Sequence, residues 1–170
     1  MKNQMKYIQI SAENPENCAI FTSLMDEYIR ELNKHSAHPI SKELQEKWVA
    51  SIITMQGPPD RHLELCYEEE DLIGFLYGKI DHPDHKGYIK PGYGYIMEFY
   101  VRPPCRRKGH GRAMFDRLER LFRTDGAGMM YLTPDPVTGK QFWETMGFAN
   151  TGEKSPENQL YIYEKPIIRN

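Results

Sequence analysis

Residues 95–122 read YIMEFYVRPPCRRKGHGRAMFDRLERLF and change character twice. Residues 95–101 are nearly all apolar, which predicts a strand buried on both faces, and Glu98 is the exception. Further along, apolar side chains recur at three- and four-residue spacing and predict a helix over about residues 110–124. Between the two lie a pair of prolines, a basic run and two glycines. The stretch is therefore predicted to be a strand, a glycine-containing turn and a helix.

The turn has the properties of an anion-binding site. The first N–H groups of a helix have no partner within the helix and lie at the positive end of its dipole, where a phosphate binds well. Glycines at positions 109 and 111 would let the backbone approach a phosphate closely. The turn adds four basic side chains: Arg106, Arg107, Lys108 and Arg112. The ligand implied is a di- or polyphosphate; the alternative is a tight turn whose basic side chains only face solvent.

The spacing of the turn residues narrows the choice of ligand. A Walker loop needs G-x-x-x-x-G-K-[ST], but Lys108 precedes Gly109 in this chain. The dinucleotide fingerprint G-x-G-x-x-G needs glycine or alanine at position 114, which is methionine. Both patterns are therefore disfavoured. What remains is R-x-x-G-x-G, from Arg106 to Gly111.

This pattern resembles the [QR]-x-x-G-x-[GA] loop that binds the pyrophosphate of coenzyme A in the GCN5-related N-acetyltransferase (GNAT) superfamily. A second segment, QFWETMGF at residues 141–148, is similar to the family's FYEKLGF signature. The resemblance extends over roughly residues 6–165. It implies an α+β fold in which a mixed, mostly antiparallel sheet is flanked by helices and splays between the strands at about 95–101 and 129–133. We expect one such domain over residues 1–170.

The resemblance also implies the activity and the residues that bind the cofactor. The activity would be transfer of an acetyl group from acetyl-CoA to a primary amine by direct attack in a ternary complex, with no metal. The pantetheine arm would pair with the strand backbone, and the turn would hold the pyrophosphate. The implied cofactor-binding residues are Phe99, Tyr100, Val101, Arg106, Arg107, Lys108, Gly109, His110, Gly111 and Arg112, together with Asp135 and Trp143.

Two residues are candidates for proton transfer. Glu98 would accept a proton from the amine or orient its ammonium group; the alternative is a structural ion pair with a nearby Arg or Lys. Many relatives protonate the leaving thiolate with a tyrosine of the second signature, but Trp143 occupies that position and its indole has no useful acidity. Tyr131 or a tyrosine of residues 88–95 would replace it, or the thiolate would leave unassisted. Asp135 would contact the pantetheine arm or the amine.

The rest of the chain alternates strand and helix patterns. We expect a first helix over about residues 15–34 and a second that starts after Ser41 with Leu44, Trp48, Ile52 and Met55 on one face. Thr138 and Gln141 form a predicted capping box for a short helix that Gly147 closes. The other predicted elements are strands at 7–10, 62–67, 72–77, 129–133 and 160–164, a hairpin turn at 68–71 and a long loop at 82–94.

Composition excludes several classes of protein. The chain has 170 residues, a net charge of −2 and a pI near 6.3, which gives no reason to expect binding to nucleic acid or to an anionic membrane. It has neither an apolar signal sequence nor a run long enough to span a bilayer, so we expect a cytoplasmic protein. The acceptor would be a small-molecule or peptide amine. The resemblance also admits a homodimer.

Two other functions stay open on the sequence alone. One is a sensor that binds acyl-CoA without turnover, and the other is a nucleic-acid-binding domain that uses residues 102–112 as its basic patch. His82, Asp84 and His85 resemble a metal cluster but are expected to be a solvated surface. Three tyrosines would either line the acceptor pocket or pack over the sheet edge: Tyr88, Tyr93 and Tyr95.

Overall fold

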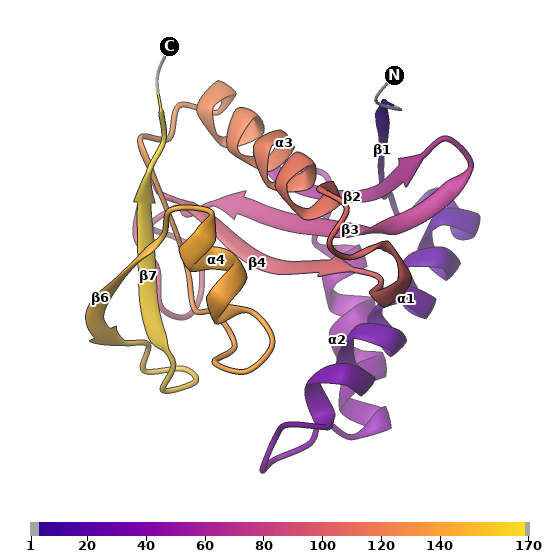
Figure 1. The fold of residues 1–170 in the computed structure, drawn as a ribbon, viewed down its shortest axis with the longest axis horizontal. Coiled ribbons are helices and arrows are strands. Elements are labelled where there is room, and N and C mark those ends of the chain that lie inside the picture. The colour runs from indigo at the N-terminus through magenta and orange to yellow at the C-terminus, as the bar shows by residue number, and fades with distance from the viewer. Residues whose placement is uncertain (1–3, 169–170) are drawn as a thin grey trace. The chain divides into compact units, whose positions relative to one another are not determined.

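The computed structural model describes residues 4–168 and contains both strands and helices (Figure 1). The strands are β1 (Met5–Gln9), β2 (Arg61–Glu68), β3 (Asp71–Ile80), β4 (Gly94–Val101), β5 (Met129–Leu132), β6 (Ala149–Lys154) and β7 (Tyr161–Pro166). The helices are α1 (Pro15–Asn33), α2 (Lys42–Thr54), α3 (His110–Thr124) and α4 (Lys140–Thr145), with a 3₁₀ turn, η1 (Pro103–Cys105). The predicted strand, turn and helix of residues 95–122 are confirmed.

The sheet has the strand order β1-β2-β3-β4-β5-β7-β6. Strand β1 runs antiparallel to β2, and β7 runs antiparallel to both β5 and β6. Strands β4 and β5 are parallel, with Gly94 opposite Met130 and Tyr95 opposite Tyr131. From that last pair β4 continues to Val101, whereas β5 ends one residue later at Leu132. The mixed, mostly antiparallel α+β sheet that we predicted is confirmed.

The contacts within the chain define two compact units. The first comprises the described residues up to Tyr77 together with Phe99–Ala113, and the second comprises Gly78–Glu98 together with the described residues from Met114 onward. Strands β3 and β4 and helix α3 each contribute residues to both units. The expectation of one domain over the whole chain stays a prediction.

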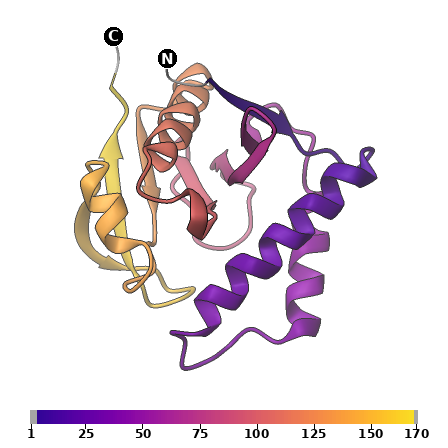
Figure 2. The same cartoon turned by 45° about the vertical axis from the view of Figure 1, so that its right-hand side comes forward.

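In the first unit, helices α1 and α2 lie side by side (Figure 2). The N-cap predicted at Ser41 is confirmed, because its side chain accepts a hydrogen bond from the amide of Leu44. The face predicted for α2 is only partly right: Ile52 is buried as predicted, but Leu44 and Met55 are exposed. Its buried residues are Gln45, Val49 and Ile52, whereas the predicted Leu44 is 56% exposed. Two adjacent stripes of this helix carry apolar side chains, and the packing in the folded unit selects one of them.

Strands β3 and β4 approach each other closely at Gly74. A Cβ atom added at this position would lie 1.9 Å from the backbone carbonyl oxygen of Tyr100. Next to it, the amide of Arg102 donates to the carbonyl of Ile73 at 2.8 Å. The obstacle is backbone, so it cannot rotate away as a flexible side chain would. Because glycine has no Cβ, position 74 lets β3 approach β4 to the observed distance. Strand β4 is the one that carries the predicted pantetheine contacts.

Gly74→Ala is expected to lower the free energy of unfolding by about 3 kcal/mol, since the added methyl group forces the two strands apart. For a chain of this size the loss corresponds to a fall in Tm of roughly 6–12 °C. The control is Gly139→Ala, where the nearest atom to an added Cβ lies at 3.5 Å, an ordinary contact. Thermal unfolding of both variants checks this, and an unchanged Tm for Gly74→Ala would show that the strands can part at no cost.

The second unit is built from β5, β7 and β6, the larger part of α3, and α4. Trp143 of α4 is 5% exposed and lies in an aromatic cluster with Phe115 of α3 and Phe148, at centroid distances of 5.7 and 5.4 Å. Strand β6 is absent from our predicted elements. All six of its residues are exposed, so they lack the apolar alternation on which a strand prediction depends.

The capping box predicted for α4 is wrong. The N-cap residue is Gly139, which has no side chain to accept a hydrogen bond. Asp135 organises the turn instead, because its carboxylate accepts from the amides of Val137 and Thr138 at 2.9 and 2.8 Å. Its carbonyl also accepts from the amides of Gly139 and Lys140. Asp135, five residues before the helix, thus supplies the side-chain acceptor that a capping box would supply at the start of the helix itself.

Candidate functional site

The predicted phosphate turn lies in the first unit, where η1 leads into α3. The amide of Ala113 donates to the carbonyl of Gly109 at 3.1 Å and begins the hydrogen bonding of the helix. The amides of His110, Gly111 and Arg112 come before that bond, so the helix offers them no carbonyl partner. Their N–H groups and the helix dipole make this end of α3 suited to a negatively charged group.

The backbone of the turn is shaped by two residues with positive φ. Gly109 has φ of +88° and Arg107 has φ of 61°. A Cβ added at Gly109 would meet no atom within 4 Å, so space lies beside the backbone at the point where the helix begins. Three basic side chains are exposed around it: Arg107, Lys108 and Arg112. Open space, amides outside the helical hydrogen bonding and exposed cations together fit a diphosphate group.

Arg106, the first residue of the motif, has a different environment from the one that we predicted. Its guanidinium forms two hydrogen bonds with the carboxylate of Glu31 on α1, at 2.9 and 2.7 Å. Its Nε donates to the carbonyl of Val101 at 2.8 Å. The pairing with Glu31 raises the pKa of Arg106. Arg106 thus anchors the turn to α1 and to the end of β4, and a contact of its side chain with phosphate stays a prediction.

The strand residues that precede the turn form part of the same unit. Tyr100 is 4% exposed, and its ring packs against Tyr28 at 5.5 Å and Phe75 at 6.2 Å. Burial, followed by the negative charges of Glu27 and Glu31, raises the pKa of Tyr100 to about 12. Its hydroxyl therefore stays neutral at any physiological pH. Phe99 and Val101, which flank it, are both partly exposed.

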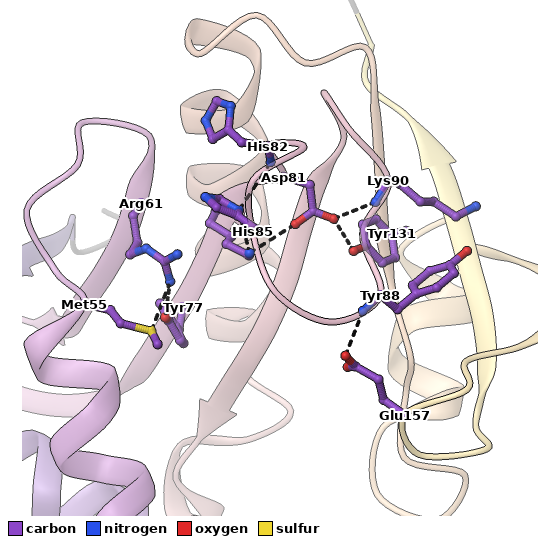
Figure 3. Close-up of polar contacts among 11 residues, drawn as sticks. Met55, Arg61, Tyr77, Asp81, His82, His85, Tyr88, Lys90, Tyr131 and Glu157 are labelled. Carbon is purple, nitrogen blue, oxygen red and sulfur yellow. Dashed lines mark hydrogen bonds and ion pairs between the residues drawn. The ribbon is translucent and has the colours of Figure 1, made fainter.

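In the second unit, Tyr131 is buried with Asp81 rather than open to solvent (Figure 3). Tyr131 is 1% exposed, and its hydroxyl donates to the carboxylate of Asp81. Its ring stacks on that of Tyr95 at a centroid distance of 4.6 Å. Burial and the bond to Asp81 both raise the pKa of Tyr131. The phenol therefore releases its proton with difficulty, and its predicted role as an acid stays a prediction.

Asp81 also holds the long loop of residues 82–93 in place. Its carboxylate accepts from the amide of Lys90 at 2.8 Å, and its backbone bonds to Tyr93 and Gly92 at 2.9 and 2.8 Å. The ammonium of Lys79 lies 3.4 Å from the other carboxylate oxygen, within ion-pair range but outside hydrogen-bond geometry. Sequence reasoning missed Asp81, although a carboxylate that directly follows a buried strand is a signal that could have identified it.

The tyrosines of the loop pack around this buried pair. The rings of Tyr88 and Tyr93 meet that of Tyr131 edge-on at 6.3 and 6.1 Å. The ammonium of Lys90 lies 5.3 Å from the ring centre of Tyr93 and forms an ion pair with Glu164. The backbone amide of Tyr88 donates to Glu157 at 2.8 Å, as Figure 3 shows. Of the two alternatives for these tyrosines, the structure supports aromatic packing.

The remaining predicted residues are distributed over the second unit. Glu98 is partly exposed in β4. Trp143 is a core residue, and a contact of its ring with the pantetheine arm stays a prediction, as does a ligand contact of Asp135. His85 accepts through Nδ1 from the ammonium of Lys79, 2.8 Å away, and so belongs to the buried network of this unit.

None of the helices in residues 4–168 has the length and apolar character needed to cross a membrane. Within the same residues, His, Cys, Asp and Glu side chains form no group of three or more that could hold a metal ion.

Comparison with known proteins gives one family and several similar structures. Residues 19–148 match the model of the acetyltransferase (GNAT) family. An acetyltransferase from Thermus thermophilus superposes with a TM-score of 0.68 at 17% identity, covering 98% of this chain and 99% of that one. The PaiA N-acetyltransferase from Thermoplasma acidophilum, solved in complex with coenzyme A, gives 0.64 at 16% identity, covering 96% and 99%. The ribosomal-protein-S18-alanine N-acetyltransferase from Escherichia coli gives 0.59 at 15%, covering 98% and 96%. No curated protein matches the sequence.

Proposed function

Because the chain belongs to the GNAT family of acetyltransferases, we propose that it transfers an acetyl group from acetyl-CoA to a primary amine. The observation that carries the proposal is the turn before α3. At this end of the helix lie a glycine with free space beside it, three amides outside the helical hydrogen bonding and exposed basic side chains. These are the features that binding of a diphosphate requires.

The residues of the first unit would hold the donor along its length. The amides of His110, Gly111 and Arg112 would bind the diphosphate, and the charges of Arg107 and Lys108 would be added from the turn. The backbone of Phe99–Val101 would pair with the pantetheine arm, as it does in the family that the sequence resembles. Since this strand leads into the turn through η1, one continuous segment of chain would position both parts of the donor.

The chemical step is attack of the amine lone pair on the thioester carbonyl. A C–N bond forms, the C–S bond breaks, the sulfur leaves as a thiolate and the amine nitrogen loses one proton. A pH of 7 lies about 3.4 units below the pKa of a lysine-like amine, so presenting the amine as its free base costs roughly 4.6 kcal/mol. Glu98 would accept that proton directly or through water. The thiolate needs no acid to leave, because an ordinary thiol pKa is only about 8.5.

The acceptor is proposed only as a class. The ribosomal-protein-S18-alanine N-acetyltransferase and the aminoglycoside 6'-acetyltransferase that share this fold carry the names of a protein and of a small-molecule acceptor. A primary amine on a peptide or on a small molecule is therefore the acceptor that we propose here. The first unit has an open depression of about 630 Å³ between α1 and α2, lined by Asp26, Glu27 and Glu46 among others. Two of these carboxylates are already in ion pairs, Asp26 with Lys42 and Glu27 with Arg102.

The first test of the proposal is thermal unfolding with and without acetyl-CoA, with NAD and ATP as controls. At 100 times its Kd a ligand adds about 2.7 kcal/mol of stability, which for a chain of this size raises Tm by roughly 5–11 °C. We expect that rise with acetyl-CoA and with neither control. A rise with NAD or ATP alone, or with none of the three, would contradict the proposal.

A sensor that binds acyl-CoA without turnover is the second candidate. It is favoured by one observation: neither Trp143 in the second signature nor the buried Tyr131 is suited to protonate a leaving thiolate. Release of free thiol in the presence of an amine separates the two candidates. Steady release supports the transferase, whereas binding without release across a broad amine panel supports the sensor.

A further inference from the structure

We propose that His110 positions the phosphate-binding turn through a proton shared with Glu68, an inference that rests on the proposed function. His110 is the first residue of α3, and its side chain is only 11% exposed. Its Nδ1 lies 2.9 Å from the carbonyl oxygen of Cys105, and its Nε2 contacts the carboxylate of Glu68, the last residue of β2. Both nitrogens of the ring therefore face oxygen atoms.

The chemistry of these partners determines where the protons lie. A carbonyl oxygen can only accept, so Nδ1 must carry a hydrogen. A neutral ring would then have a bare lone pair on Nε2 opposite a carboxylate, which also only accepts when ionised. The contact is a hydrogen bond only if one more proton lies between Nε2 and Glu68. The pair thus holds this part of the chain together as long as it keeps that proton.

The two contacts of the His110 ring fix both ends of the turn. Cys105 and His110 flank the turn, and Glu68 ties its helical end to β2. Inside it, Arg107 and Gly109 have the positive φ values that direct the following amides. Fixing both ends in advance reduces the ordering cost when a diphosphate binds. His110 is therefore a positioning residue, whose ring acts through the backbone of the turn.

Loss of the shared proton should weaken binding of the donor. Glu68 on β2 is the carboxylate in contact with Nε2 of the ring. The charged side chains of the turn and of the first turn of α3 include Arg107, Lys108 and Arg112, all exposed. When the pH rises and the proton leaves, the lone pair of Nε2 faces a carboxylate. The hydrogen bond between His110 and Glu68 is then lost. The affinity for acetyl-CoA should then fall as the pH is raised.

Two replacements of Glu68 test the shared proton. Glu68→Ala removes the partner of Nε2 and is expected to raise the Kd for acetyl-CoA about tenfold near pH 6. Glu68→Gln can donate an amide hydrogen to the bare Nε2 while Nδ1 still donates to Cys105, so it closes the turn without the extra proton. Its Kd should stay within about twofold of the wild type near pH 6 and should not rise with pH as the wild-type Kd does. His110→Ala should resemble Glu68→Ala.

Calorimetric titration with acetyl-CoA at several pH values measures these outcomes, and Tm reports whether each variant is folded. The inference is overturned if Glu68→Ala leaves the Kd unchanged, or if Glu68→Gln weakens binding as much as Glu68→Ala does. Should Glu68→Ala fail to fold, the comparison of Glu68→Gln with the wild type over pH still decides the matter. A wild-type protein that binds no acetyl-CoA would overturn the proposed function itself, whereas failure of the variants alone leaves it standing.

Discussion

Gly111→Val is expected to weaken acetyl-CoA binding by more than about a hundredfold while the protein stays folded. Gly111 is the second residue of α3, where valine can adopt the helical backbone at a cost below about 1 kcal/mol. Side chains of a helix tilt toward its N-terminus, so the branched valine would project toward the place where the diphosphate is expected to lie. The steric conflict falls on the ligand rather than on the fold.

The matched control for this variant is Asp116→Val, which introduces valine at an exposed position of the same helix. It carries a similar helical cost without approaching the turn. Calorimetric titration with acetyl-CoA gives the affinity, and thermal unfolding gives the stability of both variants. An unchanged Kd in a folded Gly111→Val protein would exclude the turn as the site of the diphosphate.

Glu98→Gln is expected to lower kcat/KM for the amine by at least about a hundredfold at pH 7, because it keeps the shape of the side chain and removes its basicity. The measurement uses an amine on which turnover has been found. If Glu98 is the base, kcat falls and the acidic limb of the pH profile changes. If Glu98 only orients an ammonium group, the KM of the amine rises with kcat nearly intact.

Glu153→Gln provides the control, because Glu153 is an exposed residue of β6. It makes the same chemical change in a strand edge and should leave both constants within about twofold of the wild type. Should Glu98→Gln also retain both constants, Glu98 would have no part in the reaction. The structural ion pair that the sequence left open would then become the better explanation of this residue.

Two local errors in the sequence-based prediction have physical causes. Thr138 and Gln141 have the spacing of a capping box, yet Asp135 satisfies the turn amides from outside that window. The exposed strand β6 pairs with β7 through its backbone, with Asn150 opposite Tyr163, and needs no apolar face to do so. Both features depend on a partner that the local sequence pattern does not include.

The candidate site shows the same difference between what local sequence patterns predict and what distant partners decide. Local rules located the turn, because strand pattern, glycine spacing and helix periodicity all lie within residues 95–122. They also counted Arg106 among the cations for phosphate. In the structure Glu31, 75 positions earlier in the chain, takes up that charge. Which basic side chains remain for a ligand is therefore a question of long-range pairing.

Short-range order in this chain follows from its residues alone. Backbone conformation and helix periodicity depend on neighbours within a few positions, so the sequence was sufficient to predict the strand, the turn and α3. The partners of buried and charged groups are set by folding. Tyr131 meets Asp81 across 50 positions and His110 meets Glu68 across 42. Hydrogen-bond and ion-pair energies depend on distances of a few ångströms, which only the packed chain defines.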